Sequence, residues 1–302
     1  MFAVANLLLL FSYMDILPIS PQLQGVAFYS NIFVLLLTMP VYLARNFAKT
    51  NENLLNLKID NARKTHELEQ ARRLQISMLP KTVPQLPNLE IAVYMQTATE
   101  VGGDYYDFKV HDDGILTVAI GDATGHGLHA GTVVAATKSL FNSLADEREP
   151  VQVLQKATKA LKAMGFREMY MALTVAKFAG HHLQIAAAGM PFTLVYRAAG
   201  NSVEEVTIKG MPLGSFPNFP YQQKELGLNA GDTVLFMSDG FPEMFNQQGE
   251  ILGEERAKAV FEETARESPE QIITHLVKAG ITWANGRAQE DDVTFVAVKV
   301  TI

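Results

Sequence analysis

The chain has 302 residues, a formal net charge of −7 at pH 7 and a sequence pI of about 5.5. This acidic balance argues against a nucleic-acid-binding protein, because phosphate backbones bind basic surfaces. The absence of cysteine excludes disulfide frameworks, Cys-ligated zinc, iron–sulfur clusters and thiol catalysis. The length is sufficient for one large domain or two small ones with a buried core.

The amino-terminal part of the chain is strongly apolar. Residues 1–44 contain no Lys, Arg or Glu and a single Asp, and residues 26–44 form an almost unbroken apolar run. At ~1.5 Å per residue this run can cross ~30 Å of hydrocarbon. Arg45 and Lys49 follow it, so the positive-inside rule places everything downstream in the cytoplasm. The alternative is a core helix of a soluble domain.

A second, weaker membrane candidate is the run 1–17, in which Asn6 and Asp15 oppose insertion. A signal peptide is the competing interpretation, although the run lacks a basic start. We therefore expect one or two membrane helices in residues 1–44. The amino terminus lies inside if both runs span the cytoplasmic (inner) membrane and outside if only the second does.

Residues 46–78 contain no Gly or Pro and predict one long polar helix. The residues at two heptad positions would form the seam of a coiled coil, and half of them are polar. Such a seam is typical of a weak coiled coil. The first position holds Leu54, Asn61, Leu68 and Gln75, and the second holds Leu57, Lys64, Ala71 and Met78. The segment is either a solvated linker or a stalk that dimerises the chain and transmits a signal from the membrane. Length and position favour the stalk, and hence a homodimer.

Pro80 ends the linker and predicts a domain boundary there. The expected organisation is a membrane anchor (1–44), a linker or coiled-coil helix (45–80) and a larger domain (81–302). Runs of consecutive strands with helices inserted in pairs predict an α+β domain. Expected strands are 89–95, 115–120, 171–178, 183–187, 193–196, 233–237 and 293–300, and expected helices are 128–145, 151–164, 254–266 and 269–284.

Four aspartates lie in short turn-like settings next to these apolar strands. They are Asp104, Asp122, Asp239 and Asp291. A carboxylate at the end of a buried strand is costly unless a positive group meets it, and no Lys or Arg is adjacent in sequence. Mg²⁺ and Mn²⁺ prefer such oxygen ligands. One Asp-Gly motif is ordinary turn chemistry, but four in one domain predict a metal-dependent hydrolase.

The segments around these aspartates resemble a known family. They read Val-Gly-Gly-Asp-Tyr-Tyr-Asp-Phe (101–108), Gly-Asp-Ala-Thr-Gly-His-Gly (121–127), Met-Ser-Asp-Gly (237–240) and Asp-Asp-Val-Thr (291–294). In this order they are similar to the signature blocks of the metal-dependent PPM-type serine/threonine phosphatases, in particular the bacterial SpoIIE/RsbU branch. The resemblance runs from about Ala71 to the carboxyl terminus and leaves the apolar segment outside it. It implies a four-layer αββα sandwich.

The resemblance also implies a site with two Mn²⁺ or Mg²⁺ ions at one edge of the sheets. Asp122 would bridge the metals with help from the Ala123 carbonyl. Asp239 and Asp291 would hold one metal, and Asp104 the second or an additional one. Catalysis is expected to depend most on Asp122 and Asp239. Two metals ~3.5–4 Å apart clamp a phosphoryl group and activate a water, so no cysteine nucleophile is needed.

Several positions depart from the family pattern or carry a second interpretation. Met190 stands where members often have the His of Ala-Gly-His-Pro, and Thr124 stands where eukaryotic relatives have a His. The general acid is therefore unassigned. His126 is expected to shape its turn rather than transfer protons. Asp107 is expected to approach a metal through water or to cap its turn, and Asp292 to orient Asp291.

These patterns predict a membrane-anchored phosphatase that faces the cytoplasm and acts on phosphoserine or phosphothreonine of a regulatory protein. Relatives in the branch act on small phosphorylated regulators such as anti-sigma-factor antagonists, which implies a similar partner. The rival from another class is a signalling scaffold with a degenerate phosphatase fold. A phosphodiesterase or nuclease is disfavoured by the acidic balance. With little chain outside the membrane, the signal would come from the bilayer, a membrane partner or a larger receptor of which this chain is a truncated form.

Overall fold

The computed structural model describes residues 10, 11, 13, 14, 20–98 and 101–302. The chain divides into two compact units, Met1–His66 and Glu67–Ile302. Most of the weaker membrane candidate, residues 1–17, lies outside the described residues, so the choice between one and two membrane helices stays a prediction.

The apolar run and the polar linker form one helix rather than two. Helix α2 runs from Pro21 to Met78, with Pro40 inside it. An 18-residue window of α2 has a mean hydropathy of 1.8, and none of that window is buried. Large apolar side chains such as Phe33 and Leu36 are exposed there. By length and composition, α2 is the one helix among the described residues that could cross a membrane.

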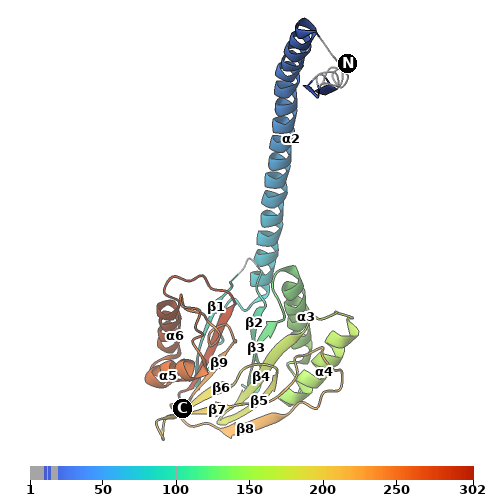
Figure 1. The fold of residues 1–302 in the computed structure, drawn as a ribbon. Helices are drawn as coiled ribbons and strands as arrows, with labels where there is room; N and C mark the ends of the chain where they lie inside the picture. The colour runs from blue at the N-terminus through green and yellow to red at the C-terminus, as the bar shows by residue number, and fades with distance from the viewer. Residues whose placement is uncertain (1–9, 12, 15–19, 99–100) are drawn as a thin grey trace. The chain divides into compact units, whose positions relative to one another are not determined.

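The larger unit is built on two five-stranded antiparallel sheets (Figure 1). The first sheet has the order β1 (Leu89–Gln96), β10 (Val293–Val300), β9 (Thr233–Met237), β6 (Thr193–Arg197) and β7 (Ser202–Val206). The second has the order β2 (Asp104–Val110), β3 (Leu116–Ala123), β4 (Met171–Ala179), β5 (His182–Ala188) and β8 (Gln223–Gly227).

Each sheet is covered by one pair of helices. Helices α3 (Leu128–Leu144) and α4 (Pro150–Ala163) pack on the second sheet, and α5 (Glu254–Thr264) and α6 (Pro269–Ala284) pack on the first (Figure 1). The layers are therefore helix, sheet, sheet and helix, and the predicted αββα sandwich is confirmed.

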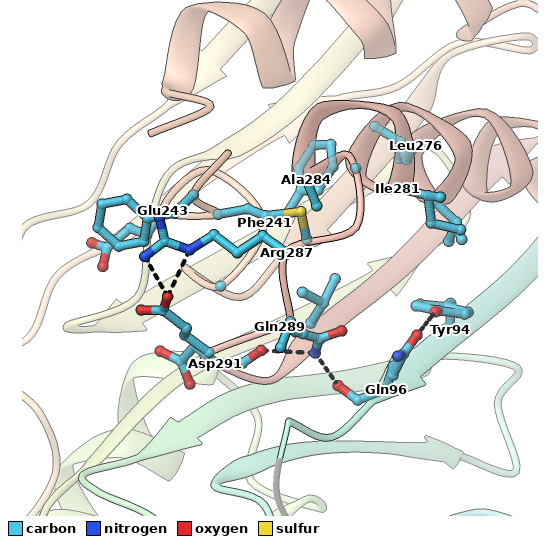
Figure 2. A pocket seen from close by; sticks show the side chains of 18 of the residues that line it. Tyr94, Gln96, Phe241, Glu243, Leu276, Ile281, Ala284, Arg287, Gln289 and Asp291 are labelled. Carbon is cyan, nitrogen blue, oxygen red and sulfur yellow. Dashed lines mark hydrogen bonds and ion pairs between the residues drawn. The ribbon is translucent and has the colours of Figure 1, made fainter. Parts of the chain in front are cut away.

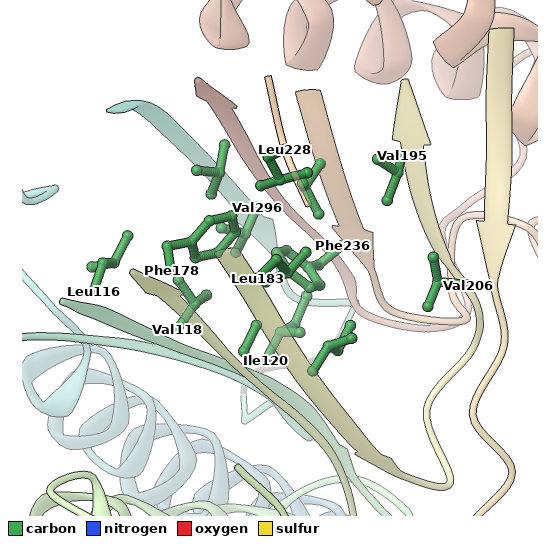
Figure 3. Packing of buried hydrophobic residues seen from close by; sticks show 14 of the residues in the cluster. Leu116, Val118, Ile120, Phe178, Leu183, Val195, Val206, Leu228, Phe236 and Val296 are labelled. Atoms are coloured by element: carbon green, nitrogen blue, oxygen red, sulfur yellow. The ribbon is translucent and has the colours of Figure 1, made fainter. Parts of the chain in front are cut away.

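Apolar side chains fill all three interfaces between the layers. Between the sheets, Ile120 and Phe178 of the second sheet meet Phe236 and Val296 of the first (Figure 3). The rings of Phe178 and Phe236 contact edge to face, with centroids 6.4 Å apart. Central strands such as β3 are buried on both faces, which explains why they read as continuous apolar runs.

The second sheet differs from its prediction at the strands that carry the aspartates. Strand β2 was not expected, because Gly102 and Gly103 indicated a turn and aspartate is a poor strand former. Strand β3 was expected to end at Ile120, but it continues to Ala123. The two strands pair antiparallel over their whole length, and the aromatic residues of β2 suit a strand despite its two aspartates. Strands β7 and β8 were also missed; both have mostly exposed residues.

Candidate metal centre

The β2–β3 pair places two of the predicted ligands opposite each other. Asp104 begins β2, and in the antiparallel register its partner is Asp122, one residue before the end of β3. A Cβ atom on Gly103 would lie 2.6 Å from both the Ala123 carbonyl oxygen and Asp122 Oδ1. Only glycine fits at this point. The Asp122 carboxylate and the Ala123 carbonyl therefore lie together in the narrow space beside Gly103.

Asp104 is buried between the two sheets, with 1% of its surface exposed. Its Oδ2 accepts hydrogen bonds from Ser238 Oγ (2.8 Å), at the end of β9, and from Thr294 Oγ1 (2.6 Å), in β10. Its Oδ1 is buried and has no hydrogen-bond partner in the described part of the chain. A buried carboxylate oxygen without a partner is costly unless a cation meets it.

Asp239 and Asp291 reach the same edge from the first sheet. Asp239 lies two residues after the end of β9, and Asp291 lies two residues before β10. The Ser238 N–H donates to the Thr294 carbonyl (3.1 Å), and a Cβ on Gly240 would lie 2.0 Å from the Asp292 carbonyl oxygen. This close approach brings the two aspartate-bearing segments of the first sheet side by side.

Asp292 holds the turn before β2. Its carboxylate accepts hydrogen bonds from the backbone N–H groups of Ala98 (2.7 Å), Gly103 (2.6 Å) and Asp104 (3.2 Å). The Asp292 carboxylate therefore orients Gly103–Asp104, and the Asp292 backbone N–H also donates to Asp291 Oδ1 (2.8 Å), as an orienting role toward Asp291 requires. The first sheet thus positions a ligand-bearing turn of the second.

The four aspartates share one electrostatic environment. Burial raises the pKa of Asp122 to about 9, and the neighbouring charges of Asp104, Asp239 and Asp291 add to the shift. Burial also raises the pKa of Asp104 well above its ordinary value, and those of Asp239 and Asp291 to a smaller extent. Among the described residues, no Lys or Arg forms an ion pair with any of the four. A metal cation bound among these carboxylates would favour their ionised forms.

The fit to a hard dication rests on the donor set. No group of three or more His, Asp or Glu side chains, within the residues that the structure describes, already has metal-ligand spacing. The oxygens themselves suit Mn²⁺ or Mg²⁺: carboxylates with raised pKa values, one backbone carbonyl beside Asp122, and the unpaired Asp104 Oδ1. The donor chemistry therefore fits a hard dication, while the described side chains do not yet have the spacing of a complete ligand set.

The remaining predicted positions have other partners. Thr124 is exposed, and its hydroxyl accepts a hydrogen bond from the Tyr170 N–H (2.9 Å). His126 is exposed and makes no hydrogen bond to the described residues. Met190 is buried in the inter-sheet core, so the family's histidine position is a packing position here.

Asp107 neither caps a turn nor faces the aspartate cluster. It is buried in β2, where it accepts hydrogen bonds from the Tyr105 hydroxyl (2.7 Å) and from Lys138 Nζ of α3 (2.5 Å). It therefore ties α3 to the second sheet.

Sequence reasoning missed three residues that support the site. The hydroxyls of Ser238 and Thr294 were visible in the quoted motifs, where each lies within three residues of a predicted ligand. Gln75 was placed on a coiled-coil seam. It is instead buried, its Nε2 donates to the Gly102 carbonyl (2.7 Å), and its Oε1 accepts from the Gly102 N–H (3.2 Å). The end of α2 therefore holds the backbone two residues before Asp104.

Two helix-covered antiparallel sheets with aspartates at their common edge define the PP2C-type, or PPM, serine/threonine phosphatase fold. The SiaA-PP2C domain of Pseudomonas aeruginosa superposes with a TM-score of 0.70 at 20% identity, covering 79% of this chain and 98% of that one. The SpoIIE phosphatase domain of Bacillus subtilis, with a fragment of its regulatory domain, gives a TM-score of 0.59 at 20% identity, covering 72% and 64%.

Residues 112–301 match the family described as Stage II sporulation protein E (SpoIIE), and the chain belongs to this family. The phosphoserine phosphatase RsbU of Bacillus subtilis is 28% identical over 218 residues, which are 70% of this chain and 65% of the relative. The chain thus spans slightly less than two thirds of that protein. The predicted family resemblance is confirmed.

Proposed function

We propose that this chain is a metal-dependent phosphatase that hydrolyses phosphoserine or phosphothreonine on a regulatory protein. The observation that carries the proposal is the buried, unpaired Asp104 Oδ1 at the edge where four aspartates from both sheets meet. The similarity to a protein named as a phosphoserine phosphatase supports the same reaction class. A small phosphorylated regulator, such as an anti-sigma-factor antagonist, is the proposed substrate.

The proposed site holds two Mn²⁺ or Mg²⁺ ions. Asp122 is the proposed bridging ligand with the Ala123 carbonyl beside it, and Asp104, Asp239 and Asp291 complete the set. Such ions supply a hydroxide-like water near neutral pH and neutralise charge on a phosphoryl group. Neighbouring side chains of the protein position the proposed ligands. Ser238 and Thr294 hold Asp104 Oδ2, which leaves Oδ1 for a cation, and Asp292 holds the Gly103–Asp104 turn.

The activity is tested on the full chain in lipid nanodiscs. We expect hydrolysis of p-nitrophenyl phosphate and of a phosphoserine peptide to require Mn²⁺ or Mg²⁺ and to be abolished by EDTA. Bis(p-nitrophenyl) phosphate, a diester, should remain intact. A folded protein that lacks activity with both metals would favour the scaffold alternative, and diester cleavage would favour the phosphodiesterase.

We further propose that residues 1–44 anchor the chain, residues 45–80 link the anchor to the enzyme, and residues 81–302 form the phosphatase domain on the cytoplasmic side. The support is the apolar, unburied window of α2 and the basic residues that follow it. Because the chain has no cysteine, single cysteines report topology without background. Lys49→Cys and Lys299→Cys should react with an impermeant maleimide only after the cells are opened.

The linker is proposed to form a homodimer that tunes the enzyme. Leu54 and Leu57 are exposed on α2, and Gln75 near its end contacts Gly102 beside the site. Replacing Leu54, Leu57 and Leu68 by serine should weaken dimerisation and change phosphatase activity. Unchanged activity in a dissociated protein would count against a regulatory stalk.

A further inference from the structure

A cavity of about 400 Å³ lies between α6 and the first sheet, next to the aspartate cluster. Its walls are mostly apolar and come from α6, β1, β10 and the segments that follow β9 and α6. The residues used below are Phe241, Leu276, Ile281, Ala284 and Phe295. This volume is within the range of sites that bind small molecules or side chains.

The cavity adjoins the candidate metal centre. Gly240, next to Asp239, and Asp291 itself both line it. Figure 2 shows Asp291 and Glu243 at one end of the cavity and Leu276 and Ile281 at the other. A substrate group at the Asp291 end therefore lies next to the apolar walls of the same cavity.

The two ends of the cavity differ in chemistry. At the far end the lining residue Ile281 is 69% exposed. At the Asp291 end, Glu290 pairs with Arg287 (2.5 Å), whereas Glu243 is exposed and forms no ion pair with the described residues. The rim thus retains an unpaired negative charge, and the interior is apolar.

We propose that this cavity binds a large apolar side chain of the phosphoprotein substrate, within about four residues of the phosphorylated serine, with a basic residue beside it that meets Glu243. The proposal rests on the phosphatase function proposed above. An extended peptide advances ~3.3–3.6 Å per residue, so a phosphoserine at the aspartate edge places its neighbours over the adjoining cavity. The cavity then supplies sequence specificity that the metal centre alone lacks.

The test compares a minimal substrate with a peptide series. The full chain in nanodiscs is assayed with p-nitrophenyl phosphate and with nine-residue phosphoserine peptides, alanine elsewhere, in which one leucine is moved from position −4 to +4. Burial of one leucine is large enough to raise kcat/KM about tenfold at the favoured position. Adding arginine next to that leucine should raise it further, and Glu243→Gln should remove this extra gain.

Ala284→Phe fills the cavity from its wall, and Thr282→Phe places the same side chain on an exposed position of α6 that does not line it. Ala284→Phe should reduce the leucine preference to less than twofold, and Thr282→Phe should retain it. Both variants should hydrolyse p-nitrophenyl phosphate like the parent. If Ala284→Phe does not fold, Ile281→Ser replaces it. This variant removes apolar surface at an exposed lining residue and should also lower the leucine preference.

Two results overturn the inference: a flat leucine scan with the parent protein, or a preference that survives in Ala284→Phe. Loss of p-nitrophenyl phosphate hydrolysis by the parent would instead contradict the proposed function. In that case fluorescence anisotropy with non-hydrolysable phosphonate versions of the peptides decides the question of the cavity. Tighter binding of the leucine peptide that Ala284→Phe abolishes would support the cavity as a docking site, and equal binding of all peptides would reject it.

Discussion

The two ends of strand β9 place buried aspartates in opposite situations. Asp232, just before β9, and Asp104, which contacts the residue after β9, are each 1% exposed. Asp232 accepts hydrogen bonds from Arg197 (3.1 Å) and from the backbone N–H groups of Ala198 (2.9 Å) and Asn229 (3.0 Å). Asp104 has two hydroxyl donors, no cation and an unpaired oxygen.

The difference separates a structural carboxylate from a functional one. At Asp232 the protein itself provides the positive charge and the donors, which makes the group a fixed part of the fold. At the Asp104 end the protein provides donors for one oxygen only and adds further aspartates. A cation from solution would supply the positive charge at this end, as the proposed metal site requires. The following predictions test that distinction.

The largest effect is expected for Asp122→Asn. Removal of the proposed bridging carboxylate should lower metal-dependent hydrolysis by ~10³-fold or more, because the site would lose the ligand proposed to serve both metals. The fold should persist, since no ion pair of the described residues depends on Asp122. Steady-state kinetics with Mn²⁺ and circular dichroism measure the two properties.

The matched control is Asp112→Asn, at an exposed position of the turn between β2 and β3. It should retain full activity. If Asp122→Asn keeps a tenth of the parent activity, Asp122 is not the bridging ligand.

At the opposite end of β9, a substitution should lower the stability of the fold rather than the activity. Arg197→Ala leaves the buried Asp232 without its cation and should destabilise the fold by about 3 kcal/mol, because an uncompensated buried charge is costly. This corresponds to a fall in Tm of about 6–12 °C for a domain of this size. Activity measured well below Tm should change less than twofold.

Arg148→Ala, which removes an exposed arginine, serves as the control and should leave Tm unchanged within a degree or two. Equal losses of Tm in both variants would show that the Arg197–Asp232 pair does not anchor this end of the strand.

The metal-free protein should lose stability as pH rises. Burial raises the pKa of Asp122 to about 9 in the folded state, so the folded protein keeps a proton that the unfolded chain releases near its ordinary value. The corresponding stability is complete at acid pH and is lost progressively as pH rises toward about 9. Melting curves in EDTA from about pH 5 to about pH 9 should show this decline.

Asp122→Asn should flatten that slope, because the titrating group is gone. Added Mn²⁺ should stabilise the parent more at high pH than at low pH, since a metal binds the ionised carboxylates. A slope identical in parent and variant would assign the decline to other groups.

The smallest effect is expected for Thr294→Val, which removes one hydroxyl from Asp104 Oδ2. Loss of a hydrogen bond that orients a ligand should weaken the apparent affinity for Mn²⁺ about tenfold. Activity at saturating Mn²⁺ should recover to near the parent value, which a titration of rate against metal concentration measures.

Thr233→Val makes the same change at the other end of β9, where the hydroxyl donates to the Ala265 carbonyl. It should lower stability modestly and leave metal affinity unchanged. Weakened Mn²⁺ affinity in both variants would remove the distinction between the two ends.

Local patterns predicted the parts of the fold that short-range interactions govern. The range of α6 was predicted without error, because Ser268 and Gln271 form a capping box, Pro269 starts the helix, and Asn285 ends it in the left-handed conformation. Strands β9 and β10 were also predicted, since burial on both faces makes them continuous apolar runs. Strand β2 was missed because Gly102, Gly103 and Asp104 read as a turn, although the aromatic residues that follow are typical of a strand.

The sequence by itself predicted which residues carry the proposed chemistry. Asp104, Asp122 and Asp239 each lie beside a glycine, Asp291 lies two residues before β10, and the order of the motifs alone indicated a phosphatase family. The tertiary structure decided how each carboxylate is satisfied. The donors to Asp104 come from Ser238 and Thr294, 134 and 190 residues away, whereas Asp107 is neutralised by Lys138 from α3. Such partners are set by the packing of two sheets and their helices, and no local spacing encodes them.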